Sequence, residues 1–129
     1  MKLLIGILIL GMSIAALGQA APKTNVPKYN PAEEAVYKGT IEDLVEHQCP
    51  VSGGPGSHIM LKLGGGTIEV HLASVDFIKM VEVNLNKGDA VEVTGWKTQV
   101  DGVDAIFARE VRHGTDVYTF RTKDGKPAW

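Results

Sequence analysis

The sequence predicts an all-β domain with one short helix. Two runs of alternating apolar and polar residues, HIMLKL and TIEVHL, flank a turn of three glycines at residues 64–66, which is the pattern of a β-hairpin. Further β-rich runs follow between the turn sequences NKGD, VDG and RHGTD. A single stretch, ASVDFIKMVEV, instead places its apolar residues at helical spacing.

Residues 1–20 have the features of a secretory signal peptide. Lys2 supplies a positive charge, LLIGILILGMSIAAL an apolar core, and Gly18 and Ala20 are small, so we predict cleavage after Ala20 or Gly18. An uncleaved membrane anchor is the alternative, but the apolar run is short for a span. The only cysteine, Cys49, lies far from the cleavage region, which argues against a lipid anchor. We therefore expect a periplasmic or secreted protein without a transmembrane segment after cleavage.

The remaining chain divides into a leader and a domain. Residues 21–34 contain three prolines and predict an extended leader, and residues 35–129 are expected to form the folded domain. The formal net charge is −2, which argues against nucleic acid as a partner because phosphates require a basic surface. One cysteine cannot form an internal disulfide. In an exported protein it indicates an intermolecular bond, a free thiol or a metal ligand.

The first strand is expected over AVYKGTIEDLVEH, residues 35–47. Gly39 lies inside it, and an internal glycine often marks a bulge or a sharp bend, so one strongly curved strand is predicted. The stretch SGGPGS after it is interpreted as a flexible connection. If Gly64 and Gly65 form the turn of the following hairpin, Leu61 faces Ile68 and Ile59 faces Val70. The apolar side chains of both strands then lie on the same face of the hairpin.

The later elements complete a barrel. Ser74 or Asp76 can cap a short helix, AVEVTGW and DAIFAREV form a hairpin around VDG, and VYTFRT adds a short sixth strand. Five strands with a curved first strand and a helix between the third and fourth predict an OB-fold Greek-key barrel with a short C-terminal strand or hairpin extension. An open meander or a β-sandwich fragment is the alternative, but closure removes exposed strand edges.

The runs KGTIED, GGGTIEVHL, KGDAVEVTG and AIFAREV, and the ending RTKDGKPAW, resemble a bacterial OB-fold family of small exported proteins. The resemblance covers most of residues 36–129 and rests on hairpin turns and strand glycines. It implies a barrel that binds a small ligand or a cation. It supplies no catalytic residues, and the histidines and Cys49 are not among the features that define that family.

The same hairpin register places His58 directly opposite His71. Opposed residues on one face have Cβ atoms about 4.5–5.5 Å apart, which suits two imidazole ligands of one metal ion. Glu69 and Met60 share this face. Cys49 and His47 end the first strand, so the connection to His58 can fold them toward the histidine pair.

Nitrogen and thiolate ligands suit zinc or copper, and we predict a metal site of His58, His71, Cys49 and His47. The spacing is not the CxxC of a zinc knuckle, and no CxxCH for covalent haem is present. A pair of surface histidines with a leftover cysteine is the alternative interpretation. SGGPGS lacks the GK[ST] of a phosphate loop. A Cys49 nucleophile would lack an orienting carboxylate, so we expect a non-catalytic protein.

The exposed face of the hairpin provides a second hypothesis. It has no aromatic platform for bases, which again argues against nucleic acid. It could instead recognise an envelope protein or a small polar or cationic ligand through Met60, Lys62 and Glu69. The sequence therefore leaves two classes of partner open, a transition metal and a protein or small ligand.

Overall fold

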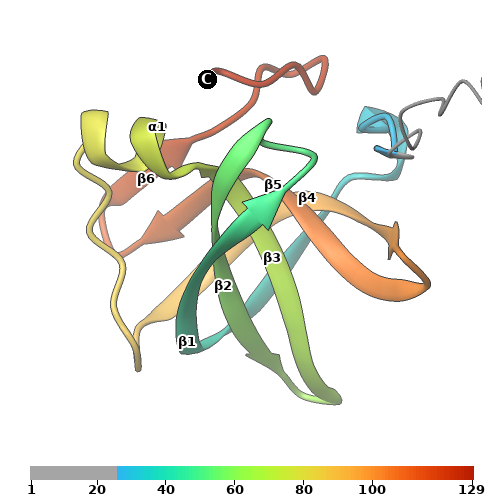
Figure 1. Ribbon diagram of the computed structural model, residues 1–129. Coiled ribbons are helices and arrows are strands. Elements are labelled where there is room, and N and C mark those ends of the chain that lie inside the picture. Colours follow the sequence, from blue (N-terminus) through green and yellow to red (C-terminus); the bar gives the residue numbers. More distant parts are fainter. Residues whose placement is uncertain (1–25) are drawn as a thin grey trace, which may run out of the picture.

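The computed structural model describes residues 26–129 and contains a barrel of curved strands (Figure 1). The predicted signal peptide and the first residues of the leader lie outside the described residues. Six strands and two short helices follow along the chain: η1 (Pro31–Glu33), β1 (Ala35–Cys49), β2 (Gly54–Leu63), β3 (Gly66–Ser74), α1 (Val75–Met80), β4 (Ala90–Val100), β5 (Val103–His113) and β6 (Asp116–Thr119). None of the helices in residues 26–129 is long and apolar enough to cross a membrane.

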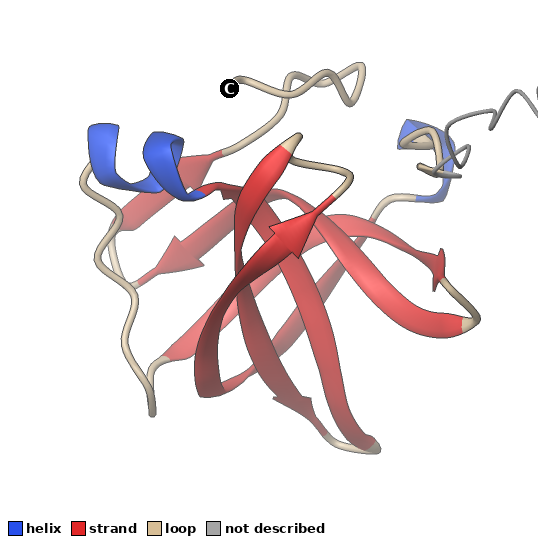
Figure 2. Ribbon diagram, in the orientation of Figure 1, coloured by secondary structure: helices blue, strands red, loops and turns tan. Residues whose placement is uncertain are grey.

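The sheet closes on itself. The strands pair in the order β3-β2-β1-β4-β5-β6, and β3 also pairs with β5. This last pairing is parallel and joins Glu69, Val70 and His71 to Ala105, Ile106 and Phe107. The ring of β1 to β5 confirms the predicted all-β, OB-like barrel, and β6 extends its edge (Figure 2). Closure pairs the strand edges that an open meander would leave exposed.

Gly39 allows two strands to approach closely. A Cβ atom at this position would lie 2.3 Å from the carbonyl oxygen of Lys62 on β2, so no larger residue fits without movement of the backbone. The bulge in the β1–β2 ladder lies slightly later, between Ile41 and Asp43. The curvature of β1 therefore combines a glycine contact and a nearby bulge.

The stretch interpreted as a flexible glycine connection is mostly strand, so that interpretation was wrong. β2 begins at Gly54, and only residues 50–53 form the turn, with Gly53 at φ 71°. His47 pairs with Gly56 and Cys49 with Gly54. Gly56 suits its place in the ladder because a Cβ atom there would lie 2.9 Å from the Cβ atom of Cys49, where no side chain has room.

The predicted hairpin register is confirmed. β2 and β3 pair Leu61 with Ile68, Ile59 with Val70 and His58 with His71. The apolar partners lie in the core of the barrel, which they share with residues from every other strand of the ring, among them Ile41, Val93, Ile106 and Val111. The helix α1 is capped by Ser74, whose hydroxyl accepts a hydrogen bond from the backbone of Phe77 at 3.2 Å.

The last residues of the predicted leader pack onto the barrel. Tyr29 is buried against Trp96 and Phe107. Glu34 binds the guanidinium of Arg109 on β5, with oxygen-to-nitrogen distances of 3.0 and 2.9 Å. These contacts attach the segment before β1 to the end of the barrel that carries the cysteine and histidine cluster.

Candidate metal centre

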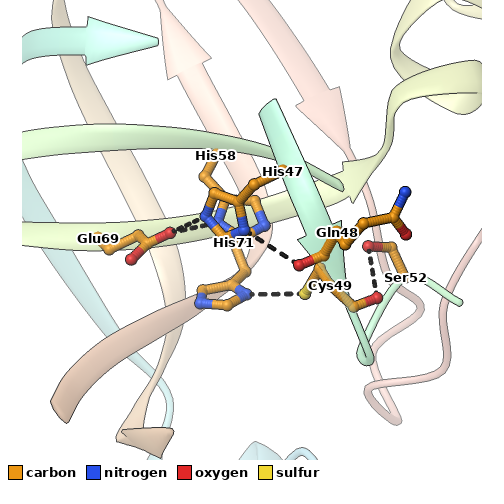
Figure 3. Close-up of polar contacts among 7 residues, drawn as sticks. All are labelled: His47, Gln48, Cys49, Ser52, His58, Glu69 and His71. Carbon is orange, nitrogen blue, oxygen red and sulfur yellow. Dashed lines mark hydrogen bonds and ion pairs between the residues drawn. The ribbon is translucent and has the colours of Figure 1, made fainter. Parts of the chain in front are cut away.

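Five polar side chains meet where β1 ends and β2 begins, beside β3 (Figure 3). His47 and Cys49 come from the last residues of β1, His58 from β2, and Glu69 and His71 from β3. The pairing of β3 with β5 lies at the same place, so the group sits at the seam that closes the barrel. Sequence reasoning placed all five near one another, and the structure brings all five together.

His58 and His71 form the centre of the group. Their ring centroids are 4.1 Å apart, and the ring of His47 lies 4.2 Å from that of His58. The expectation that the pair lies on a solvent-exposed face was wrong: His58 is 1% exposed and His71 is 9% exposed. The cause is closure of the barrel, because His71 packs against Phe107 of β5 at a centroid distance of 5.1 Å.

Cys49 completes a buried triad of nitrogen and sulfur ligands. Its Sγ atom lies 3.5 Å from Nδ1 of His71. Ligand atoms of Cys49, His58 and His71 all lie within 4.8 Å of one another. In a tetrahedral zinc site, bond lengths of about 2.3 Å to sulfur and 2.0–2.1 Å to nitrogen place two such ligands about 3.6 Å apart. The Cys49–His71 distance therefore matches two ligands of one ion.

The thiol of Cys49 is strongly acidic. Burial alone would raise its pKa, but hydrogen bonding to the His58 and His71 imidazoles, supported by Ser52, outweighs burial and lowers the pKa from 9.0 to about 5. The thiolate is therefore the dominant form at neutral pH. Because the thiolate is the form that binds metal, the site can accept a cation without first releasing a tightly held proton from sulfur.

Glu69 connects His47 and His58. Its Oε1 atom accepts a hydrogen bond from Nε2 of His47 at 2.8 Å and from Nδ1 of His58. Burial opposes ionisation of Glu69, but these two hydrogen bonds lower the carboxyl pKa overall. The pKa of His47 is raised, first by the bond to Glu69 and then by the carbonyl of Gln48.

The bond to Glu69 orients the His58 ring. Because a carboxylate only accepts, Nδ1 of His58 donates the hydrogen bond to Glu69, and the other ring nitrogen, Nε2, is left for a second partner. A Cβ atom placed on Gly56 would lie 2.9 Å from both His58 Nε2 and Cys49 Cβ, so Nε2 faces the cysteine. A histidine that donates one N–H to a carboxylate and offers the other nitrogen is the usual arrangement of a metal ligand.

Met60 and Lys62 lie farther along the hairpin. Met60 pairs with Glu69, and Lys62 pairs with Thr67 near the glycine turn. Lys62 is exposed and Met60 is partly buried. These two residues follow the same face of β2 toward its end, away from Cys49.

A small cavity lies against the triad. Its volume is about 10 Å³, and its lining includes Cys49, His58 and His71 together with Ser52, Arg121 and Trp129. That volume is enough for about one water-sized sphere. Arg121, which sequence reasoning missed, comes from the segment after β6 and gives no local signal in the sequence.

Arg121 is a buried cation in an aromatic cage. Its guanidinium carbon lies 5.0 Å from the ring centroid of Trp129, 5.3 Å from that of Tyr29 and 5.6 Å from that of Phe107. Such positions stabilise a positive charge. Burial lowers the pKa of Arg121, although a guanidinium stays protonated at neutral pH.

A groove of about 370 Å³ also borders the cluster. Cys49 and His71 line both this groove and the small cavity. The rest of its lining includes His47 at the end of β1, Glu69 on β3, Asp101 in the β4–β5 turn and Asp104 on β5. Two members of the triad, Cys49 and His71, therefore border a groove that carries three carboxylates.

One solved structure to which the chain is similar is a crystal structure of a complex of TiaS with a transfer RNA and ATP. The sequence identity is 17%, the TM-score is 0.46, and the match covers 70% of this chain and 20% of the other. This chain therefore spans only a small part of that protein. No curated protein sequence matches the chain.

The family comparison covers most of the barrel. The model of the MamS/MamX magnetosome protein family matches residues 34–118, from the end of the leader to β6. The resemblance to the bacterial OB-fold family is not confirmed, whereas the OB-like barrel is. The chain belongs to the MamS/MamX magnetosome protein family, a family of bacterial proteins.

Proposed function

We propose that this protein is a non-catalytic binding module that holds one transition metal ion, copper or zinc, through Cys49, His58 and His71. The observation that carries the proposal is the buried convergence of a thiolate and two imidazoles, with ligand atoms within 4.8 Å of one another. A single metal ion would bind all three ligand atoms at once.

The surroundings of the triad also support the proposal. Glu69 orients the His58 ring by accepting a hydrogen bond from Nδ1, so that Nε2 is directed to Cys49, and such carboxylate partners raise the affinity of metal-binding histidines. The low pKa of Cys49 supplies a thiolate at neutral pH. His47 shares Glu69 with His58 and stands at the exposed edge of the cluster, where it can receive an ion from solvent.

The donor set narrows the choice of metal. Thiolate and imidazole ligands favour zinc and copper over magnesium and calcium, which prefer oxygen. Two histidines and one cysteine bind either ion, and in copper proteins the same set forms trigonal sites with a weak further ligand. Both ions therefore belong in the test.

The experiment is a metal titration of the purified full-length chain. Zn²⁺ and Cu⁺ affinities would be measured by competition with chromophoric chelators, and Co²⁺ would serve as a coloured substitute for zinc. We expect one ion per chain and a thiolate-to-cobalt charge-transfer band. Cys49→Ser and the pair His58→Ala with His71→Ala are expected to lower the affinity at least about 100-fold, because each removes direct ligands.

His113 provides the matched control. It is a partly exposed histidine at the end of β5, outside the cluster, and it contacts Asp89 at 3.5 Å. His113→Ala should leave stoichiometry and affinity unchanged. Unchanged affinity in both the Cys49→Ser variant and the double-histidine variant would refute the proposal.

We place this activity outside the cytoplasm, because residues 1–20 predict a signal peptide. The family is described as a magnetosome protein family, and we propose that the chain acts at the magnetosome. Fractionation of cells that express the full chain, followed by N-terminal sequencing, tests both points. Recovery of an intact N-terminus in the cytoplasm would contradict export.

A protein or small-ligand binding module is the second candidate. The observation in its favour is the groove of about 370 Å³ between the end of β1 and the β4–β5 turn, which is larger than a metal ion requires. A partner that binds the metal-free chain as well as the metal-loaded chain, and that is lost on Asp101→Lys, would favour this function.

A further inference from the structure

We infer that the small cavity beside the triad binds a water-sized monoanion as an additional ligand of the metal, and that Arg121 holds this anion. The inference rests on the proposed metal site and names a second component of it. Three protein ligands, Cys49, His58 and His71, leave one tetrahedral position free. All three residues line the cavity, so we assign the free coordination position of the metal to this cavity.

The size of the cavity selects the ligand. About 10 Å³ is the space that one water-sized sphere occupies. A small monoanion such as hydroxide or a halide therefore fits beside the triad. Ser52 lines the same cavity and contributes a hydroxyl group that can donate a hydrogen bond.

Arg121 supplies the reason why the ligand is an anion. It is 6% exposed and lines the cavity. Its Nη1 donates to the carbonyl of Gly125 at 2.8 Å, but Nε has no hydrogen-bond acceptor among the described residues. None of the ion pairs within residues 26–129 includes it. A buried cation with a free donor is costly, and a bound anion removes that cost.

The aromatic cage explains why Arg121 remains available to an anion. Tyr29, Phe107 and Trp129 surround the guanidinium and stabilise its charge through their ring faces without occupying its N–H groups. The charge is thus held in place while the Nε donor stays free. A lysine would keep the charge but lose the planar set of donors.

Charge balance at the loaded site agrees with this assignment. A divalent ion bound by one thiolate and two neutral imidazoles retains a net charge of about +1 by formal count. The nearby guanidinium adds a second positive charge in a buried region. One monoanion between them neutralises part of that charge, so binding of metal and binding of anion should favour each other.

The test uses the full-length chain loaded with Co²⁺ and titrated with chloride. Ionic strength is kept constant with perchlorate, which coordinates metal ions only weakly. We expect a saturable change in the visible d–d bands of Co²⁺. Arg121→Gln should weaken chloride binding about tenfold or more, the range for loss of a charge-assisted hydrogen bond, and Arg121→Lys should weaken it less. Arg112→Gln, an exposed arginine on β5, should leave it unchanged.

Each outcome bears on one of the two proposals. A Co²⁺ protein with a thiolate charge-transfer band but no response to chloride would overturn the anion site and leave the metal site standing. Equal chloride affinity in wild type and Arg121→Gln would also overturn it. If Arg121→Gln does not fold, the chloride affinity of Arg121→Lys is compared with that of wild type, and equal affinities would overturn the anion site. Failure to bind Co²⁺ at all would instead refute the proposed function.

Discussion

His58 lies directly opposite His71 across the β2–β3 hairpin, with ring centroids 4.1 Å apart. Both rings are buried because β3 also pairs with β5 at His71. A cross-strand histidine pair at an open sheet would be solvated, whereas this pair faces a thiolate, a carboxylate and a small cavity. The contacts of this group, and those of the segment that precedes the barrel, can each be tested by substitution.

Cys49 is expected to titrate far below an ordinary thiol. With a pKa of about 5 in place of 9.0, the ultraviolet thiolate absorbance of the metal-free chain, relative to Cys49→Ser, should be present at neutral pH and disappear as the pH falls through about 5. Between pH 5 and pH 9, Cys49 is therefore mostly ionised in the folded state and mostly protonated in the unfolded state. The stability of the folded state should therefore rise with pH across that interval and reach its full contribution above 9.0. A midpoint near 9 would contradict the hydrogen bonds from the two imidazoles.

Glu69→Gln is expected to lower metal affinity about 10–100-fold, because it replaces the carboxylate that orients His58. The amide can still accept a hydrogen bond but carries no charge, so the effect should fall between the wild type and the loss of a ligand. Chelator competition measures it. Glu92→Gln is the control. It removes the exposed ion pair between Glu92 on β4 and Lys38 on β1 and should have no effect on metal affinity.

Gly56→Ala tests the close packing beneath the cluster. The new Cβ atom would lie 2.5 Å from Ser52 Oγ and 2.9 Å from His58 Nε2. We expect a loss of about 1–3 kcal/mol in the free energy of unfolding, typical of overpacking, together with weaker metal binding. Thermal denaturation and chelator competition measure the two effects. Gly54→Ala is the matched control because nothing lies within 4 Å of its Cβ position; equal losses in both variants would refute the steric argument.

Glu34→Gln is expected to loosen the segment before β1. The Arg109 guanidinium holds the pKa of the Glu34 carboxyl below its ordinary value of 4.5. The folded state therefore favours the ionised form, and this stabilisation is present above pH 4.5 and lost as the pH falls below it. Partial proteolysis should cut the variant near residues 26–34 sooner than wild type, with a stability loss of about 1–2 kcal/mol at neutral pH. Unchanged cleavage would show that the contact between Glu34 and Arg109 does not anchor the segment.

The local elements of the barrel were predictable from the residues themselves. Alternation of apolar side chains defined the faces of β2 and β3, and the turn at Gly64 and Gly65 defined their register, because a slip of one residue would turn Ile59 and Leu61 out of the core. The same register, derived from the sequence, placed His58 opposite His71. The extent of the glycine connection could not be predicted this way, because glycine adopts strand or loop according to the segments that pack against it.

Residue order alone was enough to predict an all-β chain with a hairpin that opposes two histidines and with one cysteine nearby. Three features emerged only when the barrel closed: these residues are buried, Glu69 orients His58, and Arg121 lies beside them. The physical reason is that alternation and turn chemistry act between neighbours in the chain or across one hairpin. Burial at the seam depends instead on β3 meeting β5, and the position of Arg121 depends on three aromatic rings from distant segments, Tyr29, Phe107 and Trp129.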